Sequence, residues 1–281
     1  MRLSIITPSF RSSEWLRLCI ASVADQGVEL EHIVQDSCSD DGTLDWLPSD
    51  ARVKVFVEKD SGMYDAVNRG LRKSSGDIAA YLNCDEQYLT GGLRAVLDFF
   101  DAHPEIDLLF ADCLVVDPEG ACICYRKVQT PLRYHAMVAQ LPTFTSSMFF
   151  RRKLLDQGLY FDTQWRDLGD ADWVLRAMNA NVRIGVLRRF VSAFTDTGAN
   201  MNLSANAQRE RKKMRDAAPG WARALAPALV AQHRLRRWLG GVYRQGPIDY
   251  AIYTRKSPKQ RESFHVGRPT FLWKSRLSWN S

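Results

Sequence analysis

Two carboxylates and an amide follow one apolar run in the first third of the chain. The run spans residues 78–82, and Asn83, Asp85 and Glu86 come directly after it. Open α/β sheets bind ligands at the carboxyl ends of their strands, so acidic groups at this point are well placed to meet one. Clustered carboxylate oxygens bind hard divalent cations, which in turn bind phosphate oxygens. The pattern indicates an enzyme that acts on a nucleotide.

A second segment, residues 58–71, lies just upstream of this run. Its spacing predicts a glycine-containing loop that leads into a short amphipathic helix, because Tyr64, Val67 and Leu71 recur on one helical face. We expect this loop and the acidic strand end to belong to one site.

Asp36 ends another short apolar run and is followed by the small polar residues 37–43. Its carboxylate can accept a hydrogen bond from a nucleobase N–H group. The alternative is an Asx-type turn in which Ser39 or Asp40 caps the next helix. The residues alone leave both interpretations open.

Alternating strands and helices are predicted to position these groups. The predicted strands are 3–6, 32–35, 53–57, 78–82 and 107–111. Core-facing spacing predicts a helix around Leu16, Ile20 and Val23, and another over 90–102. This alternation is typical of an α/β fold, with a mostly parallel sheet flanked by helices on both faces.

The pattern becomes mixed after residue 112. The segments 113–116 and 121–125 flank a type I turn sequence and predict an antiparallel hairpin. An apolar segment at 144–150, a helix over 170–180 and a strand over 182–186 are expected to follow. We expect no cofactor cradle of the dinucleotide or P-loop type, because residues 7–11 contain neither glycine pattern.

The C-terminal residues 204–281 are dense in Arg and Lys, mixed with Leu, Trp and Tyr. Three interpretations are open: a solvated charged helix, a nucleic-acid surface or an anionic membrane interface. No nucleic-acid recognition motif accompanies the basic residues, so no nucleic-acid partner is expected. Cations among rings and aliphatic side chains favour a membrane surface.

Composition sets the remaining limits. The chain has 281 residues, a net charge of +6 and 46% hydrophobic residues, as in ordinary globular proteins. It contains neither an apolar run long enough to cross a membrane nor an export signal at its start, so a cytoplasmic location is expected. The six cysteines are expected to be reduced. Cys84 lies beside the acidic cluster, but without a nearby histidine it is interpreted as small strand-end filler rather than a nucleophile.

Four ordered motifs give the chain a resemblance to a known family. They are T-P-S-F at 7–10, D-S-C-S-D-D-G-T at 36–43, E-K-D-S-G-M-Y-D-A-V-N-R-G at 58–70 and G-D-I-A-A-Y-L-N-C-D-E at 76–86. Over roughly residues 3 to 200 the sequence resembles the family 2 glycosyltransferases of the GT-A fold, especially bacterial enzymes that build cell-surface polysaccharide.

The resemblance implies a donor site for a nucleotide sugar. Its residues would be Thr7, Pro8, Phe10, Asp36, Asp60, Gly62, Asp65, Asn68, Asn83, Cys84 and Asp85. Asp85, with Glu86, would hold Mg²⁺ or Mn²⁺ on the donor diphosphate. The chain departs from the family's usual N-S-D-D at this point, because Cys84 and Glu86 replace Ser and Asp.

The resemblance also implies a catalytic base. Residues 168–176 resemble the family's E-D-x-x-[FLW]-x-x-R stretch and place Asp170 at the base position, with Gly169 in place of the common Glu. Asp172 and Trp173 would lie on the acceptor side. The alternative for Asp170 is a purely structural role as a helix cap.

The expected function is an inverting transfer of a sugar, from a UDP-sugar to a hydroxyl of a glycan or lipid-linked acceptor in cell-envelope polysaccharide synthesis. The catalytic domain would span 1–203, with a donor half at 1–112 and an acceptor half at 113–203. Residues 204–281 would form a basic extension that holds the protein peripherally on the inner face of the cell membrane. Two alternatives are a non-catalytic scaffold with this fold and a sugar-phosphate nucleotidyltransferase; the latter's G-x-G-x-R loop is absent after Ile6.

Overall fold

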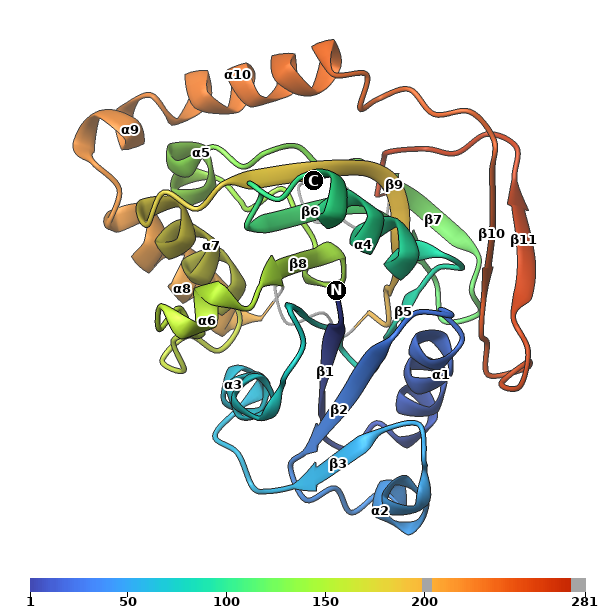
Figure 1. Ribbon diagram of the computed structural model, residues 1–281. Coiled ribbons are helices and arrows are strands. Elements are labelled where there is room, and N and C mark those ends of the chain that lie inside the picture. The colour runs from blue at the N-terminus through green and yellow to red at the C-terminus, as the bar shows by residue number, and fades with distance from the viewer. Residues whose placement is uncertain (199–203, 274–281) are drawn as a thin grey trace.

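A mixed nine-stranded sheet forms the centre of the computed structural model, which describes residues 1–198 and 204–273 (Figure 1). The strand order is β3-β2-β1-β4-β8-β6-β9-β5, and β7 pairs with β6. The strands are β1 (Leu3–Ser9), β2 (Leu30–Asp36), β3 (Lys54–Val57), β4 (Ile78–Tyr81), β5 (Glu86–Tyr88), β6 (Leu108–Val116), β7 (Cys122–Arg126), β8 (Met148–Arg151) and β9 (Ile184–Thr195).

The N-terminal half of the sheet is parallel, as the strand–helix alternation predicted. Strand β1 pairs in parallel with β2 and β4, and β2 pairs in parallel with β3. The intervening helices are α1 (Ser13–Ala24), α2 (Thr43–Trp46), the 3₁₀ turn η1 (Leu47–Ser49), α3 (Met63–Lys73) and α4 (Gly92–Ala102). Side chains of β1 alternate between two cores: Ile6 packs with α3, whereas Leu3 and Ile5 pack with α1 and α4.

The second half of the sheet is mixed. Strand β8 is antiparallel to β4 and β6, whereas β9 is parallel to β6. The predicted hairpin is present as β6 and β7, but β6 is one continuous strand where two were expected. Strand β5 was not predicted, because three residues beginning with Glu86 carry no apolar pattern. The other elements of this half are α5 (Arg133–Val138), η2 (Thr145–Ser147), α6 (Lys153–Asp156) and α7 (Gly169–Asn179).

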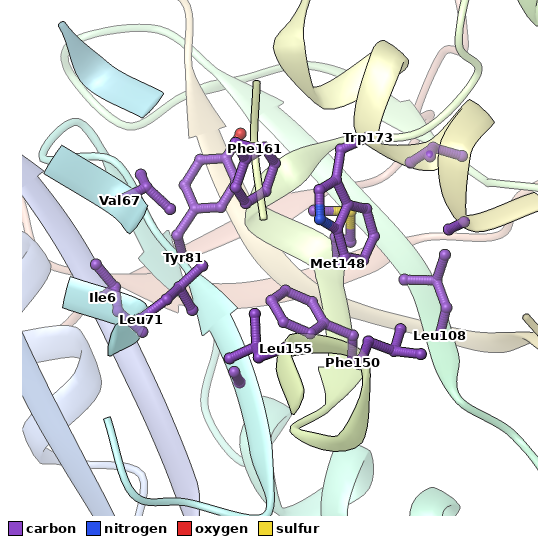
Figure 2. Packing of buried hydrophobic residues seen from close by; sticks show 14 of the residues in the cluster. Ile6, Val67, Leu71, Tyr81, Leu108, Met148, Phe150, Leu155, Phe161 and Trp173 are labelled. Atoms are coloured by element: carbon purple, nitrogen blue, oxygen red, sulfur yellow. The ribbon is translucent and has the colours of Figure 1, made fainter. Parts of the chain in front are cut away.

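Aromatic rings dominate the core between the sheet and α7. The ring of Trp173 lies 4.9 Å from that of Phe150 and 5.5 Å from that of Phe161. Phe161 also meets Tyr81 edge-on at 5.4 Å, and Figure 2 shows these rings grouped together in the core. Packing of this kind fixes the position of α7 on the sheet, because large buried rings leave few alternative arrangements.

The C-terminal segment packs on the sheet domain. Its elements are α8 (Ala205–Asp216), α9 (Gly220–Ala224), α10 (Ala226–Leu239), β10 (Ile248–Ile252) and β11 (Glu262–Val266). In Figure 1 α9 and α10 run beside α5, and the hairpin of β10 and β11 lies beyond β7. Ile248 and Tyr250 of the hairpin join a core with Leu114 and Tyr125, which the weak periodicity of this region did not predict.

None of the helices among the described residues combines the length and apolar character that crossing a bilayer requires. Parts of the predicted regions, residues 199–203 of the catalytic domain and 274–281 of the extension, lie outside the described residues.

Candidate active site

A cleft of about 920 Å³ opens where the carboxyl ends of β1, β2 and β4 meet the start of α7. The predicted site residues that line it are Pro8, Phe10, Asp60, Gly62, Asn83, Cys84, Asp85 and Asp170. The predicted residues outside the lining are Thr7, Asp36, Asp65, Asn68, Glu86, Asp172 and Trp173. The structure therefore places the first group on the wall of this cleft.

Phe10 forms an aromatic platform with two cations near its ring. Its ring is about half exposed, and it lies 5.0 Å from the guanidinium of Arg11 and 4.9 Å from Nζ of Lys59. Arg11 is held by Asp40 through two hydrogen bonds of 2.5 and 2.7 Å. A planar face can stack on a nucleobase, and cations beside it can bind phosphate oxygens.

Asp36 lies buried beneath the part of the cleft wall that contains Ser9 and Phe10. Its Oδ2 accepts hydrogen bonds from the hydroxyls of Ser9 (2.7 Å) and Ser39 (2.8 Å), and its Oδ1 accepts one from the Ser39 backbone N–H (2.7 Å). The residue has no exposed surface. These contacts hold the turn after β2 and fix Ser9, which lines the cleft. The expected capping is wrong, because Gly42 is the N-cap of α2 and neither Ser39 nor Asp40 caps that helix.

The loop before α3 is tied by its own acidic residues. Asp60 Oδ1 accepts a hydrogen bond of 2.9 Å from the Gly62 N–H, and Asp65 Oδ2 accepts one of 3.0 Å from the Ser61 N–H. Asp65 also pairs with Arg69 at 3.0 Å. Gly62 has a φ of 141°, a conformation that side chains other than glycine rarely adopt. Asp65 therefore shapes the loop, whereas Asp60 and Gly62 border the cleft.

Thr7 and Asn68 are buried cross-links. The Thr7 hydroxyl shares a hydrogen bond of 2.9 Å with His32 Nε2. The Asn68 amide donates to the carbonyl of Phe161 (2.8 Å) and accepts from its N–H (2.9 Å). Both side chains are enclosed by the core and neither lines the cleft.

Asp85 and Glu86 are neighbours whose side chains lie in different places. Asp85 lines the cleft, and burial raises the pKa of its carboxyl. Glu86 is wholly buried at the start of β5, pairs with Phe194 of β9, and accepts a hydrogen bond of 2.9 Å from the Asn83 N–H. Burial and then the charge of Asp85 raise the pKa of Glu86. The structure therefore does not bring Glu86 into the cleft as a metal ligand.

The fit of a divalent cation depends on Asp85. Among residues 1–198 and 204–273 there is no group of three or more His, Cys, Asp or Glu side chains arranged to hold a metal ion. A nearby positive charge stabilises the ionised form of a partly buried carboxylate whose pKa is raised, as that of Asp85 is. Asp85 therefore fits a cation whose other ligands come from a diphosphate or water.

Cys84 lines the cleft as a buried thiol. Its Sγ lies 3.3 Å from the carbonyl oxygen of Pro8, to which it donates, and burial raises the pKa of the thiol. A protonated thiol is a weak nucleophile, so the filler interpretation of Cys84 fits its surroundings.

Asp170 occupies the first turn of α7 and is held by Tyr64. The Asp170 N–H donates to the Tyr64 hydroxyl oxygen (3.1 Å), and that hydroxyl lies 3.4 Å from Asp170 Oδ1, to which it donates. A Cβ atom at Gly169 would lie 2.6 Å from the Tyr64 ring, too close for any side chain. The glycine that replaces the family's usual Glu is thus required by the tyrosine.

The environment of Asp170 suits a base that works near neutral pH. Burial raises the pKa of its carboxyl to about 6, although hydrogen bonds from the Ala171 N–H and the Tyr64 hydroxyl lower it. A carboxylate with this pKa is ionised at pH 7 and accepts a proton more readily than an ordinary aspartate. Its place at a helix N-terminus is compatible with the base role.

Asp172 and Trp173 support α7 and do not border the cleft. Asp172 Oδ2 pairs with Arg176 at 2.7 Å on the same helix. The fully buried Trp173 stacks on Phe161, which stacks on Tyr64 at 5.4 Å. Trp173 therefore affects the site only indirectly, by packing on Phe161, which in turn packs on Tyr64.

Several lining residues were not predicted as site residues from the sequence. They include Arg11, Lys59, Tyr64, Arg126, Arg166, Arg211 and Met214. Lys59 and Tyr64 lie inside the motif at 58–70, so that motif was a signal for them. Arg211 and Met214 come from α8, and no local spacing could have linked them to the rest of the site.

Solved structures share this architecture. S. aureus TarS, residues 1–349, in complex with UDP-GlcNAc has a TM-score of 0.59 at 19% identity, covering 85% of this chain and 73% of that one. A mannosyltransferase of Pyrobaculum calidifontis in complex with GDP-Man and Mn²⁺ has a TM-score of 0.54 at 17% identity, covering 83% and 75%. The fold is that of the GT-A glycosyltransferases, as expected.

The sequence identifies the family within that fold. The model of the family described as glycosyl transferase family 2 matches residues 4–158, more than half of the chain. The protein belongs to glycosyl transferase family 2, which confirms the resemblance of the four motifs. The matched range ends before α7, so it includes the cleft residues that follow β1, β2 and β4 and stops short of Asp170.

Curated bacterial relatives match over part of their length. TuaG of Bacillus subtilis, assigned as a teichuronic acid biosynthesis glycosyltransferase, is 34% identical over 34% of this chain and 40% of its own. A GalNAc(5)-diNAcBac-PP-undecaprenol beta-1,3-glucosyltransferase of Campylobacter jejuni is 30% identical over 42% of this chain and 40% of its own. The chain thus spans less than half the length of these relatives.

Proposed function

We propose that this protein transfers a sugar from a nucleotide sugar, with UDP as the nucleotide, to a hydroxyl group of a glycan or lipid-linked saccharide in cell-envelope polysaccharide synthesis. The observation that carries the proposal is the position of Asp170, a carboxylate with a raised pKa, in the same cleft as Asp85 and Phe10. The complexes of related folds with UDP-GlcNAc and GDP-Man support a nucleotide sugar as donor.

The proposed reaction is a single displacement. The acceptor hydroxyl oxygen attacks the anomeric carbon while Asp170 takes the hydroxyl proton. The bond between that carbon and the phosphate oxygen breaks, and its electron pair leaves with the nucleoside diphosphate. Because one base suffices and no covalent intermediate is needed, the anomeric configuration inverts.

The donor would lie along the N-terminal half of the sheet. The nucleobase of the donor would stack near Phe10, and the diphosphate would lie between Lys59 and Asp85. A divalent cation held by Asp85 would stabilise the charge on the departing diphosphate. Residues 1–112 then form the donor half of the proposed catalytic domain, and residues 113–203 form the acceptor half.

A panel of nucleotide sugars tests the donor assignment. Thermal stabilisation by a UDP-sugar that requires Mg²⁺ or Mn²⁺ is the expected result. Release of sugar 1-phosphate together with a nucleoside triphosphate, when pyrophosphate is added to the nucleotide sugar, would instead favour the nucleotidyltransferase alternative. Failure of every nucleotide sugar to bind would favour the non-catalytic scaffold.

The pH profile of the reaction should follow the titration of Asp170. Only the ionised carboxylate accepts a proton, so kcat/KM should fall about tenfold per unit as the pH drops below about 6 and level off above it. The Tyr64→Phe variant removes a hydrogen bond that lowers the pKa of Asp170, so its acidic limb should move to higher pH. A profile flat down to pH 4.5 in both proteins would contradict this assignment.

The outer face of α10 supports a peripheral membrane location. Leu235, Trp238 and Leu239 are 55%, 61% and 69% exposed and lie on the side of the helix opposite His233, which is buried against His135 of α5. Arg234 borders this apolar face. Exposed aliphatic and indole groups beside arginine match the boundary of an anionic bilayer, with cations at the headgroups.

The helix that carries this exposed face, α10, packs by its other side on the wall of the proposed acceptor half of the cleft. Helix α5 contacts α9 and α10, with Tyr134 of α5 4.6 Å from Trp221, and Ala136 and Met137 of the same helix line the cleft. A membrane on α10 would bring a lipid-linked acceptor close to that wall. The Campylobacter jejuni relative, named for a PP-undecaprenol acceptor, supports this class of acceptor.

Replacing the three exposed side chains should release the protein from lipid. We expect the triple variant Leu235→Ser, Trp238→Ser, Leu239→Ser to lose at least tenfold in partitioning onto vesicles containing phosphatidylglycerol, measured by co-sedimentation. Val57→Ser is the matched control, because Val57 is similarly exposed but lies on the edge strand β3. Equal binding of the triple variant and the control would contradict the membrane assignment.

A further inference from the structure

Helix α8 of the C-terminal segment places a buried carboxylate at the start of α7. Glu210 is only 8% exposed. Its Oε1 accepts a hydrogen bond from the backbone N–H of Arg166 (2.7 Å), and its Oε2 accepts from those of Asp167 (3.0 Å) and Leu168 (2.9 Å). One side chain, distant in sequence, thus binds three consecutive backbone donors just before the helix that carries Asp170.

These donors need an acceptor that the local sequence does not supply. The N–H groups of residues 166–168 precede the first turn of α7, and Leu168, at the N-cap of that helix, has an apolar side chain. A carboxylate near a helix N-terminus also interacts favourably with the positive end of the helix dipole. Glu210 therefore anchors the backbone that leads into α7, while the N–H of Asp170 in the first turn is bound by the Tyr64 hydroxyl.

Two further side chains of α8 join the same contact. The Ser204 hydroxyl and the Asn206 amide both donate to Asp167 Oδ2, the latter at 3.2 Å. Asn206 also donates to Glu210 Oε1 at 2.9 Å. Ser204 additionally caps α8 itself by accepting from the Ala207 N–H at 2.8 Å. The three polar residues Ser204, Asn206 and Glu210 are called here the α8 clasp; Asn206 binds Glu210 directly, and Ser204 and Asn206 meet at Asp167.

Apolar packing completes the joint between the helices. Met214 of α8 packs in one cluster with Trp165 and Ala171, which flank the start of α7. Nζ of Lys213 lies 4.6 Å from the Trp165 ring. With polar contacts on one side and an apolar cluster on the other, the segment 166–170 has little freedom to shift while α8 stays in place.

We propose that Glu210 is a positioning residue for the sugar transfer, holding residues 166–168 so that Asp170 faces the acceptor hydroxyl. The inference rests on the proposed function of Asp170. The α8 clasp lies at the wall of the cleft, because the residues it binds, Arg166, Asp167 and Leu168, line the cleft. Helix α8 would therefore serve catalysis, whereas α10 would serve membrane binding.

The Glu210→Gln variant tests the assignment. It keeps the size of the side chain but removes the charge and offers one acceptor oxygen to three donors. We expect kcat to fall about 10- to 100-fold, because a small displacement of a catalytic group has effects of this size. The donor KM should change less than threefold. Glu210 contributes a negative charge near Asp170, so the acidic limb of the pH profile should move to lower pH.

Asp216→Asn is the matched control on the same helix. Asp216 is about half exposed and pairs with Lys212, away from the cleft. This variant should keep kcat and the pH profile of the parent protein. If Glu210→Gln does not fold, Glu210→Asp retains the charge with a shorter reach and should show the same loss of kcat with an unchanged donor KM.

Amide hydrogen exchange separates this inference from the proposed function. The amides of 166–168 should exchange faster in Glu210→Gln than in the parent or in Asp216→Asn, whether or not the protein transfers sugar. Absence of transfer by the parent protein, with this faster exchange present, would defeat the proposed function and leave the α8 clasp intact. A folded Glu210→Gln variant with normal kcat, normal pH profile and unchanged exchange would overturn the inference.

Discussion

Replacing Asp170 by Asn should lower kcat by about 10²- to 10⁴-fold, the range that general-base groups contribute. The amide has nearly the same shape and can keep its contact with the Tyr64 hydroxyl, but it cannot take the proton of the acceptor hydroxyl. Donor affinity should stay within about threefold, because Asp170 belongs to the acceptor side of the proposed reaction. Acceptor-dependent release of UDP measures the first quantity, and calorimetric titration with the donor measures the second.

Asp172→Asn provides the control for this result. Asp172 lies two residues along α7, pairs with Arg176 and does not line the cleft, so its replacement should change kcat by no more than a few-fold. The fold of Asp170→Asn should be as stable as that of the parent at pH 7, because burial disfavours the charged carboxyl that the amide replaces. Equal turnover by Asp170→Asn and the parent protein would remove Asp170 from the mechanism.

Replacing Asp85 by Ala should abolish the cation dependence of donor binding. Asp85 is the carboxylate we propose as protein ligand, so without it the cation would be held only by the diphosphate and water. We expect donor affinity in saturating Mn²⁺ to fall at least tenfold and turnover to fall at least 10²-fold, since a bound cation stabilises the leaving diphosphate by several kcal/mol. Chelation of the cation should reduce the parent protein to the same level.

Glu86→Gln is the control for the cation site. Burial and the charge of Asp85 raise the pKa of Glu86, so an uncharged amide of the same size is a close substitute. This variant should keep its response to Mn²⁺ within a few-fold. If Glu86→Gln loses cation-dependent binding while Asp85→Ala keeps it, the roles of the two residues are reversed from those proposed.

Motifs predicted where the site lies better than they predicted which side chains face it. The four motifs located the carboxyl ends of β1, β2 and β4 correctly, because strand periodicity and turn residues are local properties. The direction in which each side chain points is not a local property. Asp85 and Glu86 are adjacent, yet one lines the cleft and the other is buried where β5 pairs with β9.

Other residues expected at the donor site lie behind the wall of the cleft for the same reason. Asp36 accepts hydrogen bonds from Ser9 and Ser39, and Asn68 is bound to the Phe161 backbone, which lies 93 positions away. Pairing between residues so far apart in the sequence depends on tertiary packing, which local sequence patterns do not reveal. The role of Glu210 was hidden in the same way, within a run of charges that predicted only a solvated or membrane-bound helix.

The anomeric configuration of the product tests the central claim most directly. The parent protein would be incubated with a UDP-sugar of α configuration, Mn²⁺ and a lipid-linked saccharide, and the new linkage would be determined by the one-bond carbon–proton coupling at the anomeric carbon. Direct displacement with Asp170 as base predicts a β linkage, formed by the parent protein and by Asp172→Asn but not by Asp170→Asn. An α linkage, or a product formed equally by Asp170→Asn, would contradict the account.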